Sequence, residues 1–253
     1  SPIFYKFLLD NNNFLGLSLF GDEPWLWIYL LFIVSVSTLI LFLFSLKIPD
    51  NKSDSEKFDF RIFSSFLKSR FSYFYFFGIF CYVGVEQGIN NWSSEFLYQY
   101  HSLDPAVVGV EVISAFWGNL TIGTVINLFL IKLFDEKKLL NFYAISSSII
   151  ILLALHSYSE VSVISFKILG FSISGIWSLM ISLGLNSVPK NHSIFTGILL
   201  TGIVGGALFP FIIAGLGQLF NLKVGMHIIL LGFIYLSYVG FNARPLIKNK
   251  VLI

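Results

Sequence analysis

The sequence predicts an all-α polytopic membrane protein with seven transmembrane helices. Of its 253 residues, 56% are hydrophobic and only 12% are charged, a balance that excludes an ordinary soluble domain. Roughly 20 apolar residues in a helix cross a hydrocarbon layer of about 30 Å, and seven runs approach or exceed that length. Basic residues are also scarce in every second gap between the runs, where only Lys223 occurs. The seven runs are 25–46, 71–92, 107–131, 139–155, 161–185, 193–219 and 224–241.

The basic residues also predict the orientation of the chain in the membrane. Thirteen of the 16 Lys and Arg lie on one side of the predicted helices, two lie on the other, and Lys167 lies inside a run. The side rich in Lys and Arg is normally cytoplasmic. We therefore expect the N-terminus outside and the C-terminus in the cytoplasm. Abundant Phe, Ile, Asn, Lys and Ser, typical of an AT-rich coding sequence, indicate a bacterial inner membrane.

Loop lengths divide the chain into one helix followed by six. The long charged gap contains an amphipathic stretch at 58–71 that is typical of a helix on the membrane surface. A lone helix before a six-helix bundle is explained if it is the last helix of another six-helix bundle, absent from this chain. The expected parts are an outer segment 1–24, that helix 25–46, a central cytoplasmic loop 47–70, the bundle 71–241 and a cytoplasmic tail 242–253.

Composition argues against several classes of partner and cofactor. The net charge is only +2 and the basic residues follow the topology, so no nucleic-acid partner is expected. The single cysteine excludes an internal disulfide. The four histidines lie in different segments without ligand spacing, so we expect no metal site and no cofactor.

Four polar residues in the second run form the strongest functional signal. Glu86 and Asn90, like Gln87 and Asn91, are four residues apart and share one side of a helix. Facing lipid would cost these groups several kcal/mol because they would lose water without replacement. We therefore expect them to face a water-filled cavity and to bind substrate. The alternative is that the amides only join neighbouring helices by hydrogen bonds.

A lysine inside the fifth run is the second anomaly. Counted from the predicted ends of their runs, Lys167 and Glu86 lie at similar depth, each about 9 Å from the outer surface. We hypothesise that they pair or compete for the same substrate or proton, because an ammonium group in lipid needs a partner. The alternative is that Lys167 reaches the outer headgroups with its long side chain.

Further candidates follow on the neighbouring runs. Trp177 and Ser178 belong to a polar stripe that suits a sugar, through ring stacking and directional hydrogen bonds. Asn119 faces either the cavity or a neighbouring helix. For the serine, packing between helices is the stronger alternative.

The sixth run is rich in glycine and contains a proline. Gly202, Gly205 and Gly206 allow close helix approach, and Pro210 can kink a helix. These residues predict a helix that bends or slides during gating. Static close packing is an equal alternative.

Three stretches carry a family resemblance: 82–86, the block 116–118 with 122–123, and 203–210. They resemble the second half of the major facilitator superfamily, and within it most closely the fucose and glucose/galactose permeases, which are sugar–proton symporters. The resemblance implies that these helices are the sixth to twelfth of twelve, with substrate held between two halves by alternating access. It also implies that the proton-carrying acids lie mainly in the absent half. The chain departs from the family at one position. In the family a basic residue usually follows the glycine at the inner end of the eighth helix, whereas here Thr124 follows Gly123.

We therefore predict the C-terminal portion of a secondary active transporter for a small polar solute, expected to be a sugar carried with H⁺. Its other partners would be the lipid bilayer and the N-terminal six-helix half. No covalent chemistry is implied, so we do not expect an enzyme. One alternative, a membrane transferase, would need His, Asp or Arg clustered near one interface, and the sequence has no such cluster. A second alternative is a non-transporting receptor or assembly subunit.

Overall fold

The computed structural model describes residues 26–46 and 59–247. The predicted segment 1–24, the first half of the loop 47–70 and the end of the tail lie outside these residues. The chain divides into two units, 1–55 and 56–253, and each is described by itself. The first contains helix α2 (Leu26–Ser45), which matches the predicted run 25–46. Its hydroxyl groups bond within the helix: Ser35 donates to the Leu31 carbonyl at 2.8 Å.

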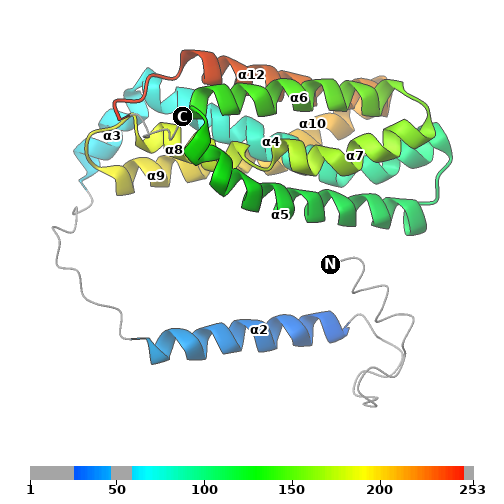
Figure 1. Cartoon of the computed structure of the whole chain (residues 1–253), viewed down its shortest axis with the longest axis horizontal. Helices are drawn as coiled ribbons and strands as arrows, with labels where there is room; N and C mark the ends of the chain where they lie inside the picture. The colour runs from blue at the N-terminus through cyan, green and yellow to red at the C-terminus, as the bar shows by residue number, and fades with distance from the viewer. Residues whose placement is uncertain (1–25, 47–58, 248–253) are drawn as a thin grey trace. The chain divides into compact units, whose positions relative to one another are not determined.

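The second unit is built entirely from helices in the part of the chain that the structure describes (Figure 1). This confirms the all-α fold class. Two short irregular turns, a π-helical turn at Pro105–Gly109 and a 3₁₀ turn at Gly202–Val204, interrupt the longer elements. The α-helices are α3 (Phe60–Lys68), α4 (Arg70–His101), α5 (Val110–Leu133), α6 (Glu136–His156), α7 (Ser159–Ile173), α8 (Ile176–Leu185), α9 (His192–Thr201), α10 (Gly205–Leu219), α11 (Leu222–Met226) and α12 (Ile228–Asn242).

Five helical stretches of the described chain are long and apolar enough to cross a membrane. Helix α4 is longer still but more polar, and α2 contributes only a shorter apolar stretch, Tyr29–Ser45. Seven transmembrane helices therefore remain a prediction, whereas the helical, apolar architecture is established. The five stretches are Pro105–Leu133, Glu136–His156, Ser159–Leu185, His192–Leu219 and Leu222–Asn242.

Helix α4 extends well beyond its predicted end at residue 92. It continues to His101 and ends at Ser102, whose backbone is left-handed with φ 54°. The extension contains neither glycine nor proline, and Phe96 and Leu97 are buried in it. Phe96 packs edge-on against Phe166 of α7, with ring centroids 5.7 Å apart. The polar residues that resembled a loop therefore belong to a helix held by its apolar face.

Helix α4 is the centre of the bundle. It contacts α10 and α12 most extensively and also reaches α5, α7, α8 and α9, while α6 packs against α7 and α12. Three spans consist of two α-helices each: α7 gives way to α8 at 174–175, α9 gives way to α10 at the 3₁₀ turn, and α11 gives way to α12 at His227. The largest fully buried side chains are mostly aromatic and join these helices: Tyr75, Phe96, Phe116, Phe166, Phe195 and Phe233.

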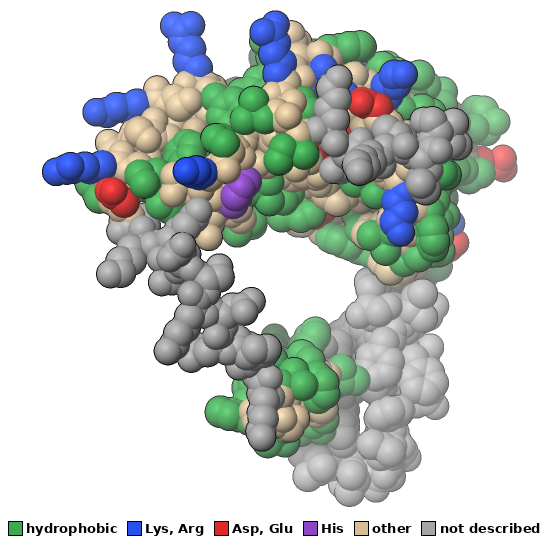
Figure 2. Space-filling view, turned by 60° about the vertical axis from the view of Figure 1, so that its left-hand side comes forward, with side chains coloured by type: hydrophobic (Ala, Val, Ile, Leu, Met, Phe, Trp, Pro, Cys, Tyr) green, Lys and Arg blue, Asp and Glu red, His purple; other side chains and the backbone are tan. Residues whose placement is uncertain are grey.

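Basic side chains gather at one end of the bundle. Figure 2 brings forward the end where α4 and α6 begin and α5 and α8 end, and Lys and Arg surround it. The predicted amphipathic stretch forms helix α3 at this end. Its first turn is capped by the Asp59 side chain, which accepts from the Arg61 amide at 2.7 Å. Lys132, Lys138 and Lys190 also lie here. The Lys and Arg residues that predict a cytoplasmic surface thus lie together at one end of the bundle.

Candidate functional site

The Glu86 carboxylate lies half-buried on the surface of the bundle and is held by its own helix. The Tyr82 hydroxyl, one turn earlier, donates to Oε2 at 2.6 Å, and the Gln87 amide donates to Oε1 at 3.2 Å. A carboxylate offers about four acceptor positions, and these two bonds use only part of that capacity. Glu86 is therefore fixed in position while it can still accept hydrogen bonds from a ligand.

Neighbouring helices add to this site. The Trp117 indole of α5 donates to the Asn90 side-chain oxygen at 2.8 Å. The Trp177 ring of α8 lies 6.0 Å from the ring of Tyr82. Helix α10 passes so close that a Cβ added at Gly206 would lie 3.1 Å from Gln87 Cγ. We call the residues that these contacts join the polar face: Tyr82, Glu86, Gln87, Asn90, Trp117 and Trp177.

The polar face combines three kinds of group that bind polyhydroxylated solutes. A carboxylate accepts, the amides of Gln87 and Asn90 both donate and accept, and two indoles offer flat apolar surfaces. It is drawn from α4, α5 and α8 beside α10, whereas α6 and α12 contribute none of its six residues. The structure thus brings together four predicted site residues, namely Glu86, Gln87, Asn90 and Trp177.

Lys167 does not pair with Glu86, and that hypothesis is wrong for this structure. Its ammonium group pairs with Glu111 at 2.5 Å, near the start of α5. Lys167 follows Phe166, which is level with Phe96, whereas Glu86 lies ten residues before Phe96 on α4. At about 1.5 Å per residue the two groups are roughly 15 Å apart in depth. The prediction that Glu86 and Lys167 lie at equal depth counted the depth of Glu86 from a helix end at residue 92, whereas α4 continues to His101.

Of three other candidates, two have hydrogen bonds that join helices and one bonds within its own helix. The Asn119 amide donates to the Lys167 backbone carbonyl at 2.9 Å, which ties α5 to α7. Ser178 accepts from Asn127 at 2.9 Å and donates to the Gly175 carbonyl at 3.0 Å. Asn91 is exposed and donates to the backbone of Gln87 at 2.7 Å. Their binding roles remain predictions, and packing accounts for the contacts of Asn119 and Ser178.

Gly202, Gly205 and Gly206 of the sixth run lie against α4. A Cβ at Gly205 would lie 2.0 Å from the Phe80 carbonyl oxygen, and one at Gly202 would lie 2.9 Å from that of Phe76. The helix is irregular at Gly202–Val204, whereas Pro210 lies inside α10 and its carbonyl accepts from the Trp92 indole at 3.1 Å. Close packing of these residues is therefore observed, and gating stays a prediction.

Sequence reasoning missed several polar partners. Tyr82 and Trp117 lie in the stretches that carry the family resemblance, but they were not predicted as site residues. The position of Tyr82, one helical turn before Glu86, is the signal that could have identified it. Asn127 is buried and accepts from the Tyr143 hydroxyl at 3.1 Å. Glu136 falls in the gap between the predicted runs 107–131 and 139–155, yet it is buried and accepts from Ser182. Among the described residues, no three His, Cys, Asp or Glu side chains are grouped so that they could hold a metal ion.

Comparison with known proteins supports the resemblance found in the sequence, although no family model matches the chain. A glucose/galactose transporter of Brucella abortus is 26% identical over 218 residues, covering 84% of this chain and 52% of the relative. A TsgA homolog of Buchnera aphidicola is 27% identical over 225 residues, covering 85% and 51%. The chain therefore spans about half the length of these relatives.

Solved structures decide the fold. The Escherichia coli fucose:proton symporter FucP superposes with a TM-score of 0.73 at 18% identity, over 85% of this chain and 54% of FucP. A second FucP structure, a major facilitator superfamily transporter in the outward conformation, gives 0.73 at 19% identity, over 88% and 54%. The bundle has the major facilitator fold. The coverage is consistent with the predicted C-terminal half, and the likeness together with the apolar helices makes the chain an integral membrane protein.

Proposed function

We propose that this chain is the C-terminal portion of a secondary transporter that carries a sugar together with protons by alternating access. The observation that carries the proposal is the polar face, a half-buried carboxylate flanked by amides and indoles on a bundle with the fold of a sugar symporter. In a major facilitator carrier, substrate is held between two halves. The polar face then supplies one wall of the site, and the N-terminal half supplies the other.

Each member of the polar face has a separate role in this proposal. Glu86, oriented by the Tyr82 hydroxyl, accepts hydrogen bonds from sugar hydroxyl groups. Gln87 and Asn90 donate and accept beside it, and the Trp117 indole holds the Asn90 amide in one orientation. Trp177 packs against the apolar face of the sugar ring. Asn91, Asn119 and Ser178 remain candidates around this centre, whereas Lys167, which pairs with Glu111, is left outside it.

The same proposal includes the location of the protein. The chain lies in a bacterial inner membrane with the basic end of the bundle in the cytoplasm, which follows from the positive-inside rule. The names of the relatives favour transport over the alternatives, because the B. abortus protein and FucP are both transporters. Neither a transferase nor a receptor role gains support from a specific feature of the described residues.

Uptake of radiolabelled sugar into vesicles tests this function. In the full-length transporter, Glu86→Ala should reduce glucose, galactose or fucose uptake about a hundredfold, because a substrate contact made through a charged group is lost. Insertion should be preserved, and thermal stability should fall by about 1 kcal/mol because the buried Tyr82 hydroxyl loses its acceptor. Glu86→Gln should retain part of the uptake through its remaining acceptor oxygen.

The matched control is Glu95→Gln. Glu95 lies on the same helix, accepts from Gln99 at 2.7 Å and is outside the polar face. Its replacement should leave uptake within about twofold of the parent. Normal uptake in Glu86→Ala would remove the central residue of the proposal. Equal losses of uptake in Glu86→Ala and Glu95→Gln would show that the substitutions damage α4 in general and do not remove a specific substrate contact.

A further inference from the structure

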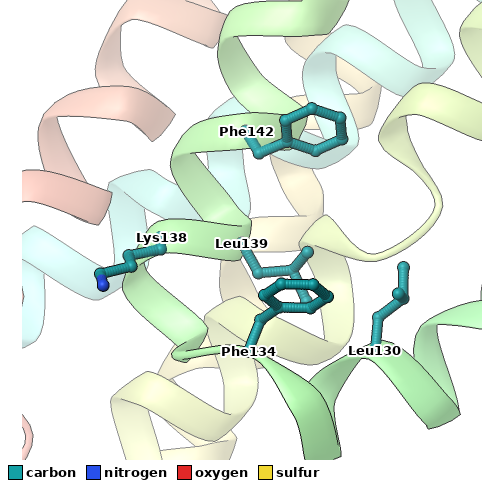
Figure 3. Close-up of a pocket in the computed structure, with 5 residues that line it drawn as sticks. All are labelled: Leu130, Phe134, Lys138, Leu139 and Phe142. Carbon is teal, nitrogen blue, oxygen red and sulfur yellow. The ribbon is translucent and has the colours of Figure 1, made fainter. Parts of the chain in front are cut away.

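An apolar pocket opens at the basic end of the bundle and shares no residue with the polar face. It lies where α5 ends and α6 begins and has a volume of about 430 Å³ (Figure 3). Four of its five lining residues are apolar, and the rings of Phe134 and Phe142 are largely exposed. The volume is within the range of small-molecule sites in proteins. The pocket lining is Leu130, Phe134, Lys138, Leu139 and Phe142.

A second, polar cleft lies next to it between the start of α6 and the end of α12. Its volume is about 540 Å³, and three of its side chains are basic: Lys137, Lys138 and Arg244. Lys138 and Arg244 are exposed. The α6 and α12 backbones approach closely here, since a Cβ at Gly240 would meet the Asn141 side chain within 2.8 Å. The floor of the cleft is therefore narrow, and its rim is basic.

The carboxylates near the cleft are already bonded. Asp135 also lines it, but its side chain caps α6 by accepting from the amides of Lys137 at 3.0 Å and Lys138 at 3.2 Å. Glu136 is buried and accepts from Ser182 of α8. Three basic side chains thus face one capping carboxylate, and the cleft favours an anionic ligand.

Lys138 lines both cavities and joins them. In Figure 3 its amine points away from the rings of Phe134 and Phe142. Phe142 lies six residues into α6, so the apolar pocket extends roughly 9 Å along the helix from the basic end. A charged cleft at the helix ends next to an apolar pocket along the helix matches the arrangement of a phospholipid, whose phosphate lies above its acyl chains.

We propose that this end of the bundle binds an anionic phospholipid, with the phosphate against Lys137, Lys138 and Arg244 and an acyl chain in the pocket between α5 and α6. The charge of the cleft selects the anionic headgroup, and the exposed rings supply apolar area for the chain. A free phosphate ion would use the cleft alone. The site lies outside the polar face, so it does not depend on which solute the transporter carries.

Native mass spectrometry of the full-length transporter with added lipid tests the site. Phosphatidylglycerol should bind more tightly than phosphatidylcholine. Lys138→Gln should weaken phosphatidylglycerol binding about fivefold, and Lys138→Gln with Arg244→Gln about twenty-fivefold, because each basic residue near the headgroup contributes separately. The control is Lys190→Gln, a basic residue at the same end that lines neither cavity. It should change binding less than twofold.

The acyl-chain pocket has its own pair of variants. Leu130→Trp fills the pocket and should weaken phosphatidylglycerol binding about tenfold, whereas Leu128→Trp, at an exposed position on the same helix that does not line the pocket, should not. Thermal unfolding of each variant identifies those that fail to fold, and the charge variants then carry the test. Equal binding of both lipids, or full displacement by 10 mM inorganic phosphate, would overturn the proposal. So would a crosslink from a cysteine at Phe142 to the N-terminal half.

Discussion

Glu86 and Glu136 are both carboxylates on helices of the same bundle, but their surroundings differ. Glu86 takes its hydrogen bonds from its own helix, from Tyr82 and Gln87, and remains half-buried. Glu136 is only 5% exposed and accepts from Ser182 on another helix, at 2.5 Å. Ser182 in turn accepts from Asn186 at 3.3 Å. A carboxylate bonded within its helix can still receive a ligand, whereas one enclosed by another helix mainly joins α6 to α8.

The largest expected effect on stability comes from the enclosed carboxylate. Glu136→Ala should lower the free energy of unfolding by about 3 kcal/mol, because the buried carboxylate that joins α6 to α8 is lost and the half-buried Ser182 hydroxyl loses its acceptor. Thermal unfolding of the purified transporter measures this, and Glu136→Gln should recover part of the loss. Uptake per folded molecule should stay near the parent value. If Glu136→Ala is stable but fails to transport, Glu136 acts in transport and does not mainly join α6 to α8, which contradicts the role proposed for it.

Close packing behind the polar face should produce the next largest effect. Gly205→Ala should destabilise the bundle by about 2 kcal/mol, because its methyl group would lie 2.0 Å from the Phe80 carbonyl and would push α10 away from α4. Gly215→Ala in the same helix has no neighbour within 4 Å and is the matched control. The difference between the two unfolding temperatures gives the contribution of the contact. Equal temperatures would show that α10 does not need this close approach.

A smaller effect is expected where an indole orients an amide. Trp117→Phe keeps a ring but removes the N–H that donates to Asn90 at 2.8 Å. The half-saturation concentration for sugar uptake should rise about fivefold, which corresponds to about 1 kcal/mol for one hydrogen bond. Unfolding temperature should change little. If stability falls while the half-saturation concentration is unchanged, the Trp117–Asn90 contact is a packing contact and the polar face is smaller than proposed.

The smallest effect is expected at the lysine. Its partner Glu111 has a side chain that is 62% exposed, so solvent weakens the ion pair. Lys167→Gln should therefore cost about 0.5 kcal/mol and leave uptake within about twofold of the parent. A double-mutant cycle with Glu111→Gln measures the coupling. Loss of uptake in Lys167→Gln alone would return this residue to the substrate site.

Most helices could be predicted from the sequence because apolar length is a local property. The runs 25–46 and 139–155 match α2 and α6 to within a few residues at each end. The end of α4 could not be found this way, because residues 93–101 are mostly polar and their helix is stabilised by contacts such as Phe96 with Phe166. The breaks at 174–175 and Gly202–Val204 contain glycines that lie against neighbouring helices, Gly175 against Tyr143 and Gly202 against Phe76, and these contacts cannot be found from one run alone.

The candidate site was only partly predictable for the same reason. Glu86, Gln87 and Asn90 were identified because polar groups in an apolar run are costly. Their partners Trp117 and Trp177 come from other helices, and the spacing of residues along one helix does not reveal which neighbours it meets. The proposed pair of Lys167 with Glu86 failed because an error of nine residues in the end of α4 moved Glu86 by roughly 14 Å in depth.

The sequence by itself determined the class of this protein. The free energy of moving a side chain from water into lipid depends on its chemistry and not on its neighbours, so apolar length and the distribution of Lys and Arg are sufficient to identify a polytopic bundle. Only the tertiary structure decided which polar groups stay available. That outcome depends on whether another helix supplies the hydrogen-bond partner, as it does for Glu136, or leaves the carboxylate at the surface, as for Glu86.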